Sequence, residues 1–135
     1  MEATQATGPF EVKITPEPFH EAGRDEGLVR MSIDKRFHGD LEATSRGEML
    51  AARTEEPGSA GYVAMERVTG KLHGREGAFV LQHSSTMNRG TPTQSIRVVP
   101  DSGTGELAGL SGSMTIVIED GKHSYVFEYA LAPGG

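Results

Sequence analysis

Apolar and polar residues alternate along short runs through most of this chain, a pattern typical of β-strands with one buried face. In residues 62–72 the even-numbered positions are the more apolar set, and the odd-numbered positions are the more polar one. Residues 77–87 repeat the alternation, with Phe79, Leu81 and Met87 on the more apolar side. Because strand side chains alternate between two faces, these stretches predict a hairpin with a four-residue loop at 73–76.

Glycine and proline separate the remaining runs, as expected for antiparallel strands joined by turns. Asp120-Gly121 lies between two alternating runs and is a strong signal for a two-residue hairpin turn. The segments expected to contain strands are 9–14, 29–41, 43–53, 62–72, 77–87, 93–99 and the two arms of 113–130, and the longer loops are expected at 15–27 and 100–112. The turn at 120–121 predicts the inward pairs Ile118 with His123, Ile116 with Tyr125, Met114 with Phe127 and Gly112 with Tyr129.

Eight such strands, each with one apolar face, predict an all-β fold that forms a single domain over residues 1–135. Closure into an eight-stranded antiparallel barrel removes the exposed strand edges that would otherwise recruit other chains. A two-sheet β-sandwich is the alternative, because alternation alone separates the two architectures poorly. A barrel of this size holds either packed side chains or one small ligand.

The composition excludes several classes of function. A net charge of −6 without a basic cluster argues against nucleic acid as a partner. The chain has no Cys, and its five His show no ligand-like spacing, so neither a metal nor another cofactor is expected. No apolar run has the length of a membrane span, and the first residues do not resemble a signal peptide, so we expect a cytoplasmic protein that does not enter a membrane.

Glu66 and His83 are the polar residues that interrupt the apolar sides of the predicted hairpin. If Leu72 faces Gly77 across the loop, Glu66 faces His83, and opposed residues share one face with Cβ atoms roughly 5 Å apart. Such an inward pair can move a proton or hold a carbonyl oxygen during catalysis. The alternative is a structural pair, since buried polar groups need hydrogen-bond partners in any protein.

Other residues on the predicted interior are candidates for ligand contact. Lys35 either completes a Lys–Glu–His network or, as we expect, extends its ammonium to the mouth of the barrel along its apolar stem. Tyr125 and Tyr129 either donate hydrogen bonds to a ligand or are core residues whose hydroxyls reach rim carbonyls. The complete set of candidate ligand-binding residues is Lys35, Tyr62, Leu81, Met87, Met114, Tyr125, Phe127 and Tyr129.

Several segments together resemble a bacterial domain-of-unknown-function family, number 3224. They are Gly8-Pro-Phe-Glu-Val12, Lys35-Arg-Phe-His-Gly-Asp-Leu-Glu42, Met65-Glu-Arg-Val-Thr-Gly-Lys-Leu72, Gly77-Ala-Phe-Val-Leu-Gln-His83 and Val98-Val-Pro-Asp-Ser-Gly-Thr-Gly-Glu-Leu-Ala-Gly-Leu110. The resemblance implies a barrel similar to that of allene oxide cyclase and the dirigent proteins. Those distant relatives steer cyclisations of small molecules without a cofactor, but no catalytic residue carries over to this sequence.

Two functions from different classes follow. The first is a cofactor-independent isomerase or cyclase that uses Glu66 and His83 on a small hydrophobic molecule in the barrel. The second is a non-catalytic binding protein for such a molecule. A filled barrel that only associates with other proteins is a third. A homo-oligomer is compatible with the apolar residues left for the outer face, which are Val63, Val80, Val117 and Val126.

Overall fold

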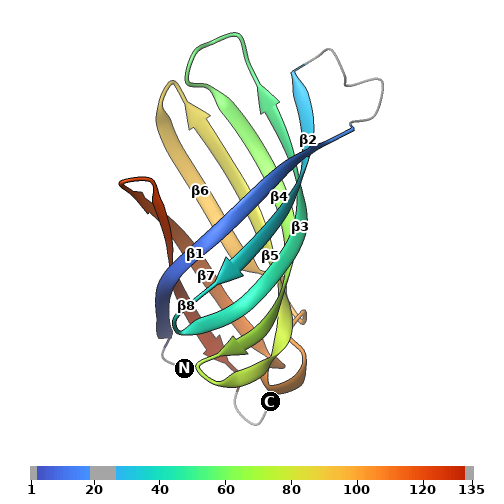
Figure 1. Cartoon of the computed structure of the whole chain (residues 1–135), viewed down its shortest axis with the longest axis vertical. Helices are drawn as coiled ribbons and strands as arrows, with labels where there is room; N and C mark the ends of the chain where they lie inside the picture. The colour runs from blue at the N-terminus through green and yellow to red at the C-terminus, as the bar shows by residue number, and fades with distance from the viewer. Residues whose placement is uncertain (1–2, 19–26, 133–135) are drawn as a thin grey trace.

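Eight strands form one closed antiparallel barrel in the computed structural model, which describes residues 3–18 and 27–132 (Figure 1). Strands adjacent in sequence pair with one another, and β1 pairs with β8 to close the barrel. The all-β barrel prediction is confirmed, and the sandwich alternative is wrong. The strands are β1 (Thr4–Glu17), β2 (Leu28–Phe37), β3 (Leu41–Arg53), β4 (Ala60–Leu72), β5 (Arg75–Asn88), β6 (Thr91–Val98), β7 (Leu110–Glu119) and β8 (Lys122–Leu131).

Strand boundaries differ from the prediction mainly at β1 and at the end of β2, which stops at Phe37 although 29–41 was predicted. Strand β1 begins at Thr4 and continues through Pro16, whereas the sequence predicted 9–14 followed by a loop at 15–27. Small residues and the Gly8-Pro9 pair hide the alternation at its start, although Ala6 is fully buried. At its end, Pro16 still lies opposite Met31 of β2. Residues 19–26 of the predicted loop lie outside the described residues.

The turn between β4 and β5 has two residues rather than the predicted four. His73 and Gly74 both adopt positive φ, 47° and 80°, which is the geometry of a tight hairpin turn. Arg89-Gly90 joins β5 to β6 in the same way, where a longer turn at 88–92 was expected. The predicted turn at Asp120-Gly121 and all four of its predicted pairs are confirmed.

The shorter turn changes the register of the β4–β5 hairpin by two residues. Leu72 lies opposite Arg75, so Glu66 lies opposite Leu81, and His83 lies opposite Ala64. The predicted direct pairing of Glu66 with His83 is therefore wrong. A change of two residues leaves every side chain on its predicted face, because the side-chain period of a strand is two.

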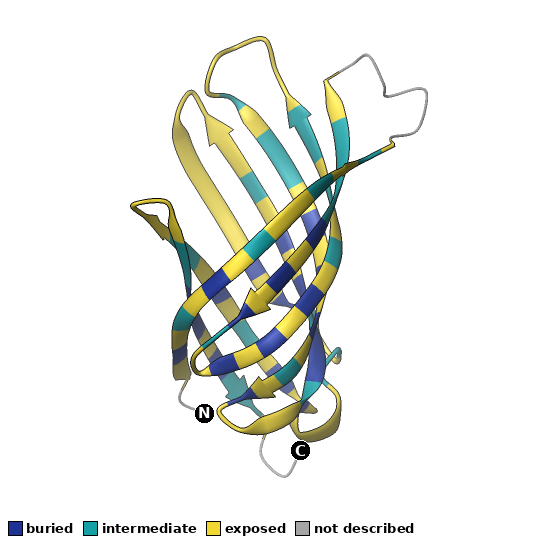
Figure 2. Cartoon of the chain, viewed as in Figure 1, coloured by how far each residue is buried: buried dark blue, intermediate teal, exposed yellow. Residues whose placement is uncertain are grey.

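The hydrophobic core fills only one half of the barrel. Figure 2 shows the buried positions concentrated toward the end where both termini lie, and exposed positions dominating the opposite end. We call these the closed end and the open end. The turns at 54–59, 89–90 and 120–121 form the open end, while the turns at 38–40 and 73–74 and the segment 99–109, which contains the 3-10 helix η2 (Gly105–Leu107), form the closed end. The largest fully buried apolar side chains are Phe37, Leu41, Leu72, Phe79, Leu81, Ile96, Leu107, Tyr125 and Phe127.

The seam between β6 and β7 is the weakest in the barrel. Arg97 and Ser113 are the only pair in register between these strands among the described residues. Nearer the open end, the Gln94 side chain accepts a hydrogen bond from the Ile116 N–H (3.3 Å) in place of a backbone carbonyl.

Candidate functional site

The open half of the barrel contains a cavity of about 360 Å³. This volume lies at the small end of the range for ligand pockets, and such pockets combine apolar walls with a few placed polar groups. Its walls are mainly apolar, with small side chains such as Ala51, Ala60 and Gly61 near the open end. The lining side chains that are polar or charged are Lys35, Arg53, Tyr62, His83, Gln94 and His123.

A buried polar cluster lies between this cavity and the core. Lys35, Ser45, Glu66 and His83 are the buried polar or charged residues in the described part of the chain, and they come from four consecutive strands, β2 to β5. Lys35 Nζ donates to Glu66 Oε2 (2.8 Å), and Ser45 Oγ donates to Glu66 Oε1 (3.0 Å). His83 Nε2 lies 2.7 Å from Glu66 Oε2. Glu66 is thus the centre of the cluster.

Gly47 makes room for the Glu66 side chain. It lies opposite Glu66 in the β3–β4 ladder. A Cβ atom at position 47 would come within 2.0 Å of the Met65 carbonyl oxygen and 2.8 Å of Glu66 Cβ. Any larger residue would therefore displace the strand that carries the carboxylate.

The electrostatics of the cluster keep Glu66 ionised. Burial by itself would raise the pKa of Glu66, but the contacts with His83 and Lys35 outweigh it and lower the pKa to about 2. The Lys35 ammonium also lies near the Phe10 and Phe37 rings, 5.3 and 5.9 Å from their centroids, which favours a cation. Lys35 therefore completes a Lys–Glu–His network, and the expectation that it extends to the mouth is wrong.

His83 connects the cluster to the cavity. Its ring lines the cavity, and its buried Nε2 faces the Glu66 carboxylate. The contact is close, but its alignment falls outside hydrogen-bond geometry. The other ring nitrogen, Nδ1, has no hydrogen-bond partner among the described residues, and it is the atom that His83 can offer to a bound molecule.

The remaining predicted ligand-binding residues divide between cavity, core and rim. Tyr62 lines the cavity, and burial raises the pKa of its hydroxyl, partly offset by the Gln94 and Ser85 side chains. Met87 is 40% exposed, pairs with Ala60 near the open end and does not line the cavity. The other five predicted residues belong to the hydrophobic core and do not line the cavity, and they are Leu81, Met114, Tyr125, Phe127 and Tyr129.

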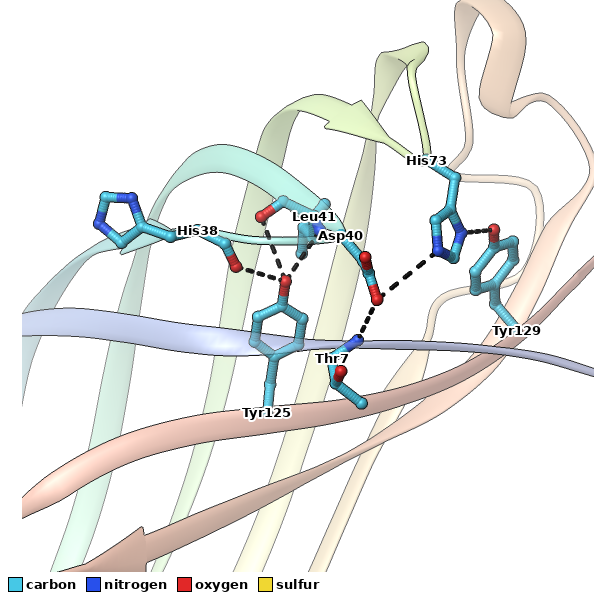
Figure 3. A network of polar contacts seen from close by, with 7 residues as sticks. All are labelled: Thr7, His38, Asp40, Leu41, His73, Tyr125 and Tyr129. Carbon is cyan, nitrogen blue, oxygen red and sulfur yellow. Dashed lines mark hydrogen bonds and ion pairs between the residues drawn. The ribbon is translucent and has the colours of Figure 1, made fainter.

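Tyr125 links the two sides of the β2–β3 turn at the closed end (Figure 3). Its hydroxyl donates to the His38 carbonyl oxygen (2.6 Å) and accepts from the Leu41 N–H (2.8 Å). The hydroxyl thereby satisfies backbone groups on both sides of the β2–β3 turn. This is the core role considered above for the interior tyrosines, and it leaves Tyr125 without a function in the cavity.

Tyr129 belongs to a second closed-end network, also drawn in Figure 3. Its hydroxyl contacts His73 Nδ1 (2.5 Å), and His73 Nε2 lies 3.7 Å from Asp40 Oδ2. The same Asp40 oxygen accepts from the Thr7 N–H (3.0 Å). This network ties the turns at 38–40 and 73–74 to β1, so it holds the closed end together.

The sequence pattern did not identify every residue of the site. Ser45 lies in a weakly patterned strand, and only its inward parity marks it. Arg53 lines the cavity from the last position of β3, and Gln94 lines it from the polar first half of β6, where alternation carries little information. His123 lines the cavity, as its inward pairing with Ile118 indicates.

His, Asp and Glu side chains of the described residues form no group of three or more that could hold a metal ion. No helix within residues 3–18 and 27–132 has the length and apolar composition needed to cross a membrane.

A family model and a solved structure place this chain in the same protein family. A family model described as "Protein of unknown function (DUF3224)" matches residues 6–129. The chain is similar to a protein of unknown function from Shewanella oneidensis MR-1, whose crystal structure at 1.84 Å resolution is assigned to the same family. The two chains are 52% identical, with a TM-score of 0.93, and the match covers 98% of this chain and 100% of the other. No curated protein matches this chain.

Proposed function

We propose that this chain, which belongs to the DUF3224 family of proteins of unknown function, binds a small, largely apolar molecule in the open half of its barrel. The observation that carries the proposal is the cavity of about 360 Å³, with apolar walls and two polar side chains, Lys35 and His83, where it meets the buried cluster. Apolar walls supply affinity, and a few placed polar groups supply orientation. The closed half, by contrast, is filled by its own side chains.

The geometry of the site supports ligand binding better than a role for Glu66 as a general base. A general base works best when its pKa lies near the operating pH. The pKa of Glu66 is about 2, far below neutral pH. Glu66 is only 1% exposed, and its two carboxylate oxygens face Lys35, Ser45 and His83. We therefore assign Glu66 the role of holding Lys35 and His83 in place for the ligand.

The binding proposal is tested with a neutral fluorescent probe, N-phenyl-1-naphthylamine, titrated into the protein. Ala51→Phe places an aromatic ring in the cavity wall and should abolish binding, because Ala51 lines the cavity opposite Tyr62. Leu50→Phe is the matched control, since Leu50 is the preceding residue on the same strand and is 46% exposed on the outer face. Equal binding by wild type and Ala51→Phe, or loss only in Leu50→Phe, contradicts the proposal.

A cofactor-independent isomerase or cyclase is the second candidate. It is favoured by the arrangement at His83, where a carboxylate faces one ring nitrogen and the other has no partner among the described residues. A base oriented by a third group is the usual arrangement in proton-transfer sites. In this mechanism His83 moves the proton and Glu66 orients the ring. The likeness to allene oxide cyclase, which remains a prediction, points the same way.

The catalytic proposal is tested on whatever small molecule copurifies with the protein, followed by mass spectrometry. His83→Asn should retain probe binding and lower turnover roughly 100- to 10,000-fold, the usual effect of losing a general acid or base. Glu66→Gln should also lower turnover, through loss of the orienting carboxylate. Release of the copurifying molecule unchanged by the wild-type protein contradicts catalysis and leaves the binding proposal intact.

We further propose cytoplasmic residence and association between copies of the chain. Leu50, Val63 and Met65 are each about half exposed on the outer face of β3 and β4, and Leu50 pairs with Val63. Light scattering after size-exclusion chromatography measures the stoichiometry, and cell fractionation tests the location.

A further inference from the structure

The charged side chains that line the cavity share one sign. They are Lys35 and Arg53, and no Asp or Glu among the described residues lines the cavity, whereas two histidines, His83 and His123, also do. The chain as a whole has 19 acidic and 13 basic residues, excluding histidine. The cavity therefore has the opposite charge preference to the protein that surrounds it.

The buried ion pair is oriented with its positive end toward the cavity. Lys35 and His83 both line the cavity, whereas Glu66 lies behind them and does not. The Lys35–Glu66 pair is neutral in sum, but the ammonium is the nearer charge for a molecule in the cavity. Charges interact more strongly there than at the surface, because the apolar walls provide a medium of low dielectric constant.

Lys35 also retains hydrogen-bonding capacity. An ammonium group has three N–H donors, and one of them donates to Glu66 Oε2. The described residues provide no further acceptor for the other two, since its other close contacts are the faces of Phe10 and Phe37. These two N–H groups of Lys35 are donors suited to one acceptor group at the end of the cavity next to the buried cluster. Charge-assisted hydrogen bonds to such a group are stronger than neutral ones.

We infer that the ligand is a small apolar acid whose carboxylate lies against Lys35 and His83 and whose apolar body extends along the cavity toward the open end. This inference rests on the proposed binding function. A neutral molecule of the same shape can accept a hydrogen bond from Lys35 but lacks the attraction between opposite charges, and a cation is repelled by the ammonium. A small hydrated anion without an apolar body gains nothing from the walls, where Val12, Ile33, Met49 and Ile116 face the cavity.

Three probes of the same chain length test the inference at pH 7.5, namely octanoate, octan-1-ol and octylammonium, each displacing N-phenyl-1-naphthylamine. Octanoate should compete roughly ten-fold or more better than octanol, the effect of a hydrogen bond to a charged group, and octylammonium should compete least. Octanol matching octanoate, octylammonium exceeding it, or no displacement by octanoate overturns the inference and leaves the binding proposal standing. Failure of the naphthylamine itself to bind contradicts the binding proposal instead.

The double variant Lys35→Met/Glu66→Gln tests whether the preference for octanoate over octanol arises from the buried ion pair. It removes both charges of the buried pair together, so neither is left uncompensated. Octanoate should lose its advantage over octanol, while octanol competes as in the wild type. Lys13→Met is the control, because Lys13 is exposed on β1 and does not line the cavity. A preference retained in a folded double variant, or lost in Lys13→Met, overturns the assignment. The comparison of the three probes on the wild type does not depend on that variant folding.

Discussion

Glu66 holds the buried polar cluster together, and sequence alone located only part of that cluster. Alternation placed Glu66, His83 and Lys35 on inward faces, which the structure bears out. The contacts among them depend on the registers of three neighbouring ladders, and these are set by turn lengths that the pattern does not specify. Ser45 lies between Ala43 and Gly47 on the inward face, so no large apolar residue marks it. Sequence therefore predicts which residues are inside better than which of them meet.

The ionised state of Glu66 should make stability depend on acid pH. Its folded pKa of about 2 lies below its ordinary value of 4.5, so the stabilisation is fully present above about pH 4.5 and is lost as pH falls toward 2. At neutral pH the contribution is on the order of 3 kcal/mol, since the two pKa values differ by about 2.5. Urea unfolding of wild type and Glu66→Gln should give free energies that converge between pH 4.5 and 2. If the difference in free energy of unfolding between the two proteins stays constant over this range, the ionised Glu66 carboxylate is not its source.

Among the strands, hairpin faces were predictable, and a hairpin register was predictable only where the turn was recognised. The Asp120-Gly121 turn was recognised because Asp-Gly is a common two-residue turn, and its pairs followed. His73-Gly74 forms the same kind of turn with His at positive φ, but His-Gly is not among the sequence signals for this turn. The longer loop assumed there shifted the register by two residues, and the faces survived only because the shift was even.

The β6–β7 seam should be the first part of the barrel wall to exchange its amide hydrogens. β4 pairs with both neighbours along nearly its whole length, whereas β7 has one pair in register with β6, Arg97 with Ser113. Residues 115–119 have no in-register partner on β6, and the Ile116 N–H donates to the Gln94 side chain. Hydrogen exchange followed by NMR should show the amides of these residues that face β6 less protected than the amides of residues 64–72. Equal protection in the two strands would mean that the seam closes in solution.

The whole molecule is a barrel with one packed half and one hollow half, a division that the pattern of apolar stripes could not reveal. The stripes run the full length of the strands, so both halves have inward apolar side chains. Side-chain size makes the difference. Phe79 stacks on Phe127 in the closed half, with ring centroids 5.7 Å apart, while Ala51, Ala60 and Gly61 leave space near the open end. Sequence predicted closure and left open whether the interior holds side chains or a ligand.

This division predicts that stability and binding separate along the barrel axis. Phe127 is fully buried and stacks on Phe79 and Tyr129, so Phe127→Ala should lower the free energy of unfolding by about 3–5 kcal/mol. Ile118 lines the cavity but is 62% exposed, so Ile118→Ala should change stability by no more than about 0.5 kcal/mol while weakening N-phenyl-1-naphthylamine binding. Urea unfolding and probe titration measure the two effects on the same samples. Similar losses of stability in both variants would show that the open half is packed like the closed one, and the cavity on which the proposed function depends would then not exist in solution.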